Sequence, residues 1–85
     1  MKVLAKIFVS LKDSVLDPQG QAVSHALHAL KYDTVQDVRI GKYMEVTLVA
    51  DDLEQATDMV CGMCEKLLTN PVIEKYTYEL GEAPE

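Results

Sequence analysis

The chain has 85 residues, with 14 acidic and 8 basic side chains and a formal net charge of −6. This charge excludes nucleic acid as an expected partner, because affinity for a phosphate backbone comes mostly from lysine and arginine. No apolar run approaches the roughly 20 residues of a membrane-spanning helix, and a second lysine within residues 1–6 comes too early for a signal peptide, so the sequence predicts a cytoplasmic protein.

Residues 2–11 are predicted to form the first strand, because two sets of side chains alternate along them. The face expected to belong to the core carries Val3, Ala5, Ile7, Val9 and Leu11. The opposite face mixes lysines with Leu4 and Phe8. We therefore expect Leu4 and Phe8 to lie at an interface with another subunit.

A first helix is predicted from Asp17-Pro18 to about Lys31, since aspartate is a good N-cap and proline fits the first turn. His25 and His28 should face outward. The apolar side of this helix comprises Gln19, Val23, Ala26, Leu27 and Leu30.

Residues 35–41 and 43–50 alternate in hydrophobicity and are predicted to form two strands of a hairpin. The turn would lie at Gly41-Lys42, where glycine can supply a positive φ. In the second of these strands the covered face should carry Met44, Val46 and Leu48.

A second helix is predicted over residues 52–69, with Asp52 and Gln55 forming a capping box and Asn70-Pro71 ending it. Residues 72–80 should form the last strand, and residues 81–85 a flexible tail without an apolar anchor. The apolar stripe of the helix comprises Leu53, Ala56, Val60, Met63, Cys64 and Leu67.

The order βαββαβ predicts one α+β domain over residues 1–85, with a four-stranded antiparallel sheet and both helices on one face, the ferredoxin-like arrangement. So small a sheet leaves a face and an edge open. We therefore expect a dimer or tetramer whose sheets extend across subunits.

Cys61-Gly-Met-Cys64 and His25-Ala-Leu-His28 together would supply four zinc ligands. However, the cysteines lie on the apolar side of their helix, whereas the histidines lie opposite theirs, so no metal site is predicted. Cys61 and Cys64 also lie in the middle of a helix, whereas a redox-active thiol needs a position such as a helix N-terminus, which lowers its pKa. Both cysteines are interpreted as structural, reduced thiols.

The polar turn residues leave two interpretations open. Gly20 lies in a helical first turn, where glycine costs about 1 kcal/mol relative to alanine. Either turn geometry requires it, or Gln19 and Gly20 let another backbone approach closely. Arg39 and Lys42 are either a solvated charge cluster or a contact for a partner.

Four motifs then stand in order along the chain. They are Leu-Asp-Pro-Gln-Gly at 16–20, Val-Arg-Ile-Gly-Lys at 38–42, Cys-Glu-Lys-Leu-Leu at 64–68 and Asn-Pro-Val-Ile-Glu-Lys-Tyr at 70–76. With this spacing the chain resembles, over about residues 4–80, the PurS family, the small subunit of three-part phosphoribosylformylglycinamidine synthase.

The resemblance implies a non-catalytic subunit of an ATP- and glutamine-dependent C–N ligase in purine biosynthesis. The large synthetase subunit would hold ATP and Mg²⁺, a separate glutaminase would release ammonia, and this chain, inactive alone and without a cofactor, would keep the two in register. A small-molecule-binding regulatory module of the ACT type is the alternative. Residues expected to contact the partner subunits are Asp17, Gln19, Gly20, Arg39, Gly41 and Lys42.

Overall fold

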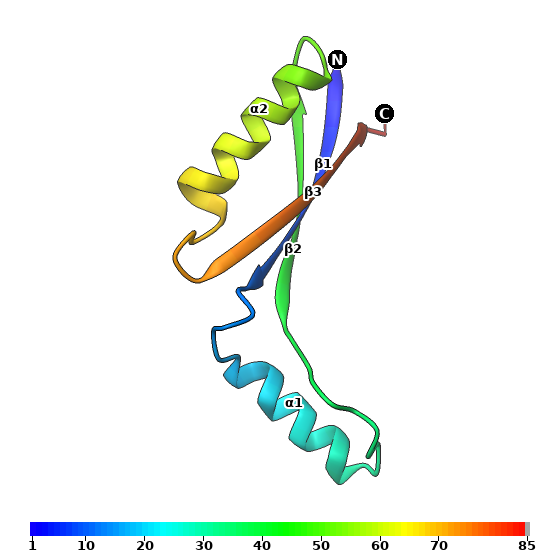
Figure 1. The fold of residues 1–85 in the computed structure, drawn as a ribbon. Helices are drawn as coiled ribbons and strands as arrows, with labels where there is room; N and C mark the ends of the chain where they lie inside the picture. The colour runs from blue at the N-terminus through cyan, green and yellow to red at the C-terminus, as the bar shows by residue number, and fades with distance from the viewer. Residues whose placement is uncertain (85) are drawn as a thin grey trace.

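The computed structural model describes residues 1–84, and its elements lie along an extended molecule (Figure 1). Within these residues the sheet has three strands in the order β2-β1-β3, and both pairs are antiparallel. The elements in chain order are β1 (Lys2–Leu11), α1 (Pro18–Ala29), β2 (Gly41–Val49), α2 (Leu53–Met63), the π-helical segment η1 (Cys64–Leu68) and β3 (Glu74–Glu82).

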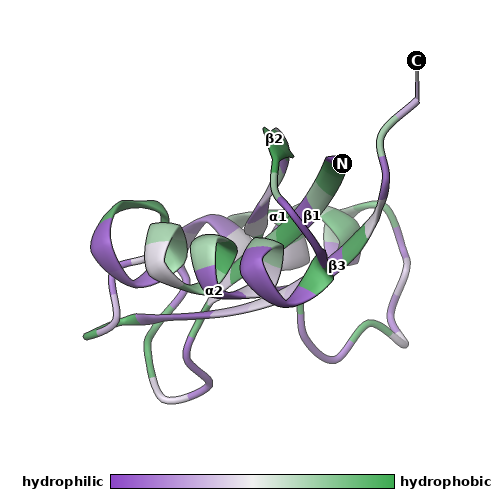
Figure 2. Ribbon diagram, turned by 90° about the horizontal axis from the view of Figure 1, so that it is seen from above, coloured by the Kyte–Doolittle hydropathy of each residue, from purple (hydrophilic) through white to green (hydrophobic). Residues whose placement is uncertain are grey.

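The core lies between one face of the sheet and α2. The alternation in β1 is confirmed, because Val3, Ala5, Ile7 and Val9 are buried. The covered face expected within residues 43–50 is also confirmed, because Met44, Val46 and Leu48 belong to the core or pack against it. From β3, Tyr76, Tyr78 and Leu80 pack against the same core. From α2 and η1 the core receives Ala56, Val60 and Cys64. Hydrophobic and hydrophilic residues alternate around the turns of α2, as Figure 2 shows.

The predicted hairpin and four-stranded sheet are wrong for the described residues. Residues 35–40 form no strand, because the chain enters β2 at Gly41 without a turn at Gly41-Lys42 and this segment therefore does not fold back beside β2. Gly41 lies within β2, opposite Ser10, rather than in a turn. No glycine among residues 1–84 has a positive φ, so the conformation expected at Gly41 is wrong too.

The prediction that both helices cover one face is also wrong. Helix α2 lies along the sheet, whereas α1 lies beyond the end of the strands at which β1 ends and β2 begins (Figure 1). Its apolar side therefore meets no sheet, and Leu30 is 67% exposed. The radius of gyration is 16.5 Å, against about 12 Å for a compact domain of this length.

The helix starts were predicted correctly. Asp17 caps α1 by accepting a hydrogen bond from the Gly20 N–H, and Asp52 caps α2 by accepting one from the Gln55 N–H at 2.8 Å. The Gln55 side chain reaches back to the N–H of Asp51 rather than of Asp52, so the reciprocal bond lies one residue earlier than in the predicted box. Helix α1 ends at Ala29, two residues before the predicted end.

At the end of the second helix, the side chain that faces the core is not the one predicted. From Cys64 the helix continues as η1, and the wider π turn rotates the following side chains. Leu67 is consequently 83% exposed and Leu68 packs against the core in its place. Leu53, also expected in the apolar stripe, is exposed in the first turn of α2.

The last strand begins and ends two residues later than predicted, so the first residues of the expected tail are ordered by pairing. Gly81 and Glu82 lie opposite Leu4 and Val3 of β1, and the Ala83 N–H donates to the Lys2 carbonyl at 3.2 Å. Backbone pairing holds these residues without apolar side chains. The final residue of the predicted tail, Glu85, lies outside the described residues.

Candidate functional site

Two of the sequence motifs meet where the sheet joins α1. We call this region the neck and define it as residues 12–20 and 38–41. Its centre is Asp17, which is 4% exposed. One carboxylate oxygen, Oδ1, accepts a hydrogen bond from the Gly20 N–H at 2.9 Å, and the other, Oδ2, accepts one from the Ile40 N–H at 2.7 Å. The side chain therefore ties the start of α1 to the residue that precedes β2.

The hydrogen bonds from Ile40 and Gly20 favour the ionised carboxylate, and they lower the pKa of Asp17 below its ordinary value. Desolvation acts in the opposite direction and Arg39 contributes a smaller lowering. Asp17 is consequently charged at neutral pH, with both oxygens engaged by backbone N–H groups.

Arg39 links the same two segments from the other side. Its Nη2 donates to the carbonyls of Lys12 and Val15, at 3.0 and 2.9 Å. The residue is otherwise exposed. Arginine is suited to this role because its planar group presents several donors in a fixed geometry. The neck is thus held by polar contacts to backbone groups rather than by a hydrophobic core.

The two glycines of the neck permit close approach of backbone segments. A Cβ at Gly20 would overlap the carbonyl oxygen of Val38, and a Cβ at Gly41 would overlap that of Val9. Of the two interpretations left open for Gly20, the structure supports close approach of another backbone, and the approaching segment belongs to the same chain.

The remaining two candidate residues lie differently. Gln19 is exposed on the first turn of α1. Lys42 is the second residue of β2, and its Nζ lies 3.4 Å from the Glu74 Oε2 of β3, so its side chain reaches across β1. The pKa of Glu74 is lowered, first by the hydrogen bond that its carboxylate accepts from the Asn70 N–H and then by Lys42.

The structure therefore brings together Asp17, Gly20 and Arg39, places Gly41 beside them, and leaves Gln19 and Lys42 at the margins. Sequence reasoning missed the partner groups, because they are backbone atoms: the Ile40 N–H and the carbonyls of Lys12, Val15 and Val38. It also missed the contact of 2.8 Å between His28 Nε2 and the Val35 carbonyl, which joins α1 to the returning chain.

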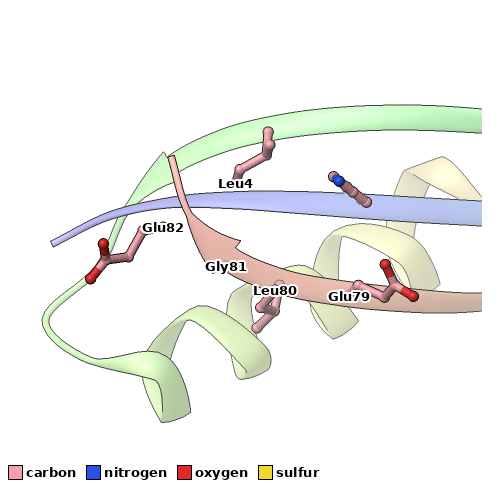
Figure 3. Close-up of a pocket in the computed structure, with 6 residues that line it drawn as sticks. Leu4, Glu79, Leu80, Gly81 and Glu82 are labelled. Carbon is pink, nitrogen blue, oxygen red and sulfur yellow. The ribbon is translucent and has the colours of Figure 1, made fainter. Parts of the chain in front are cut away.

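The outer face of the sheet, opposite α2, bears the two residues expected at an oligomer interface. Phe8 is 41% exposed and its ring centroid lies 5.1 Å from that of Tyr43. A hollow of about 360 Å³ adjoins Phe8, with Lys75 and Thr77 also in its lining. A second hollow, of about 190 Å³, adjoins Leu4, and Figure 3 shows it where β1 meets the end of β3.

The expected burial of Cys64 is confirmed. Both thiols are unbridged; Cys64 is fully buried and Cys61 is half-buried. Burial raises the pKa of Cys64 above that of an exposed thiol. Burial also raises the pKa of Tyr76 to about 12, with Cys61 nearby adding to the shift. The histidines lie on α1 and the cysteines on α2 and η1, and these helices are well separated in Figure 1, so the four do not converge.

Two further observations bear on other classes of function. Among residues 1–84, no three histidine, cysteine or acidic side chains are grouped so that they could hold a metal ion. The helices of the described chain are also too short or too polar to cross a membrane.

Comparison with known proteins places this geometry in a family. The family model described as PurS, phosphoribosylformylglycinamidine (FGAM) synthase, matches residues 4–82. The chain belongs to the PurS family. This membership favours a synthase subunit over the ACT-type regulatory module considered from the sequence.

Several relatives in the PurS family match along nearly their whole length. The PurS subunit of Bacillus subtilis is 61% identical over 77 residues, which cover 91% of this chain and 90% of the relative. The solved PurS of Thermus thermophilus is 39% identical, with a TM-score of 0.85 and coverage of 99% of this chain and 100% of the other. A chain in the structure of PurLQS from Thermotoga maritima is 31% identical, with a TM-score of 0.87 and coverage of 94% and 98%.

Proposed function

We propose that this protein is the small, non-catalytic subunit of a phosphoribosylformylglycinamidine synthase complex of de novo purine biosynthesis. The observation that carries the proposal is the close match in fold to a chain solved within a PurLQS assembly. Its partners would be a synthetase subunit, which would hold ATP and Mg²⁺, and a glutaminase subunit. The complex would work in the cytoplasm, and this chain would hold the two sites in register for ammonia transfer.

The polar residues of the neck are consistent with a structural task. The carboxylate of Asp17 and two donors of Arg39 are engaged by backbone groups, so they are not arranged to activate a nucleophile or to bind phosphate. We propose that the exposed residues Gln19, Arg39 and Lys42 contact the partner subunits directly. Asp17, Gly20 and Gly41 would contribute by shaping the neck.

The test is reconstitution with untagged synthetase and glutaminase purified from the same source. A tag on this chain should recover both partners, and the solution mass should give the stoichiometry. Glutamine-dependent synthesis should require all three proteins, whereas the isolated chain should turn over neither glutamine nor ATP. If the other two subunits reach the full glutamine-dependent rate without this chain, the proposed function is wrong.

We also propose that the chain self-associates as a dimer or tetramer through the outer face of the sheet and the strand edges. The exposed rings of Phe8 and Tyr43 on the outer face leave apolar surface that a second copy can bury. The edges of β2 and β3 that face away from β1 have no strand beside them in the described chain, so a second copy could extend the sheet there.

Phe8→Glu tests self-association, because it places a charge on the outer face beside Tyr43. Met59→Glu, at a side chain of α2 that is exposed to a similar degree, is the matched control. Sedimentation over a range of concentrations should show a weakened oligomer for Phe8→Glu and an unchanged one for Met59→Glu. A wild-type protein that is monomeric at every concentration would exclude the proposed oligomer.

A further inference from the structure

Asp17 makes two contacts where helix capping requires only one. The bond from Gly20 satisfies a donor of the first turn of α1, as any N-cap residue does. The bond from Ile40 has no part in capping, because Ile40 precedes β2 and lies 23 residues away along the chain. The second bond fixes the helix to the sheet.

The N-cap of the other helix supplies an internal comparison. Asp52 accepts from the Gln55 N–H alone, and α2 is held against the sheet by Ala56, Val60 and the rest of the core. Helix α1 has no such packing, since only Gly20 among its residues is buried. Its direction relative to the sheet is consequently set by the neck.

From this geometry we infer that Asp17 is a positioning residue for the synthase complex. By accepting hydrogen bonds from both Gly20 and Ile40, it holds α1 at a fixed angle to the sheet. This angle aligns the partner subunits for glutamine-dependent synthesis. The inference rests on the proposed function. Gly20 supports the lock by letting the Val38 carbonyl lie against the first turn of α1. Arg39 supports it by holding residues 12–15.

Asp17→Asn separates capping from locking. Asparagine caps helices about as well as aspartate. The N–H groups of Gly20 and Ile40 approach different oxygens of Asp17, and in asparagine one of these two atoms is an NH2 donor, so one of the two bonds is lost. Asp52→Asn is the matched control, since Asp52 accepts one N–H and asparagine can retain that bond. Gly20→Ala is the second variant. Its methyl group would push the Val38 carbonyl away from α1 while the Asp17 carboxylate stays unchanged. It can replace Asp17→Asn in the test if that variant does not fold.

The first measurement is the orientation of α1, taken from residual dipolar couplings of backbone amides in the isolated subunit. Amides of α1 and of the sheet should share one alignment tensor in the wild type and in the Asp52→Asn control, in which Asp17 is unchanged. In Asp17→Asn and in Gly20→Ala the couplings of α1 should fall relative to those of the sheet, while its helical chemical shifts persist.

The second measurement is the ratio of glutamine-dependent to ammonia-dependent synthesis by the reconstituted complex, with the subunit at saturating concentration. A merely destabilised subunit would lose apparent affinity without changing this ratio. Asp17→Asn and Gly20→Ala should lower the ratio by roughly tenfold, since a misplacement of about 1 Å can reduce rates by up to about 100-fold. Asp52→Asn should leave it unchanged.

Three results would overturn the inference. In the first, α1 stays fixed and the ratio is unchanged in both folded neck variants. In the second, α1 becomes mobile and the ratio is unchanged, so its angle has no role. In the third, the ratio falls although α1 stays fixed, so Asp17 acts by direct contact. Failure of the wild-type chain to support glutamine-dependent synthesis would instead refute the proposed function.

Discussion

The two helices of this chain are held in opposite ways. Helix α2 contributes Ala56 and Val60 to a core that is closed by apolar contacts. Helix α1 lies beyond the sheet and is joined to it through the carboxylate of Asp17 and the guanidinium of Arg39. The difference teaches that one end of the molecule is closed by its own hydrophobic core, whereas at the other end polar contacts fix a helix whose apolar side chains stay exposed.

Charge separates the two helices in the same way. Residues 18–32 contain no acidic side chain and one lysine, whereas residues 53–68 carry Glu54, Asp58, Glu65 and Lys66. The cores of protein interfaces are depleted of charged residues. The neutral surface of α1 therefore suits burial against a protein, and the charged surface of α2 suits exposure to water.

The largest expected effect is the loss of stability on truncating the core end. Ile7→Ala should lower the free energy of unfolding by about 2–5 kcal/mol, because Ile7 is fully buried. Leu30→Ala, in the exposed end of α1, should change it by no more than about 0.5 kcal/mol at low protein concentration. Urea unfolding measures both. Equal losses at every concentration would mean that α1 packs within its own chain.

A smaller effect should distinguish two glycines. Gly20→Ala should reduce the free energy of unfolding by about 1–3 kcal/mol, because the added methyl group would overlap the Val38 carbonyl. Gly62→Ala should increase it by about 0.5–1 kcal/mol, since no atom lies within 4 Å of a Cβ there and alanine favours a helix interior. Thermal or urea unfolding of both variants supplies the comparison, and stabilisation by Gly20→Ala would contradict the described neck.

The sequence predicted those parts of the fold that depend on neighbouring residues. The first strand has the predicted bounds, and Asp17 and Asp52 are the N-caps. These features follow from alternation and from local hydrogen bonding, which are visible in a short stretch of chain. Cys64 was also predicted to belong to the apolar stripe of its helix, and it is fully buried.

The position of α1 could not be predicted, because an apolar stripe indicates that a helix is covered but not which molecule covers it. Similarly, alternation at residues 35–40 indicated a strand, but alternation does not show whether the chain turns back to pair with its neighbour, and here it runs directly into β2. The motif residues were recognised as a group, but their roles depend on backbone atoms that any sequence supplies. Gly41 was expected to adopt a positive φ in a turn. Instead, its lack of a side chain lets the Val9 carbonyl lie close to it.

The smallest expected effect is the response of the neck to acid. The pKa of Asp17 is lowered in the folded chain, so its contribution to stability is fully present above its unfolded value of about 3.9 and is lost as pH falls through the lower folded value. The neck should therefore be insensitive to pH near neutrality and loosen only below about pH 4.

The amides of Gly20 and Ile40, which bind the same carboxylate, should titrate together with one midpoint below that of an exposed aspartate. The Asn70 amide should follow Glu74 separately, because the carboxylate that accepts its N–H is that of Glu74 and not that of Asp17. Amide chemical shifts recorded between about pH 2 and 6 test this, and different midpoints for Gly20 and Ile40 would mean that Asp17 does not join α1 to β2 in solution.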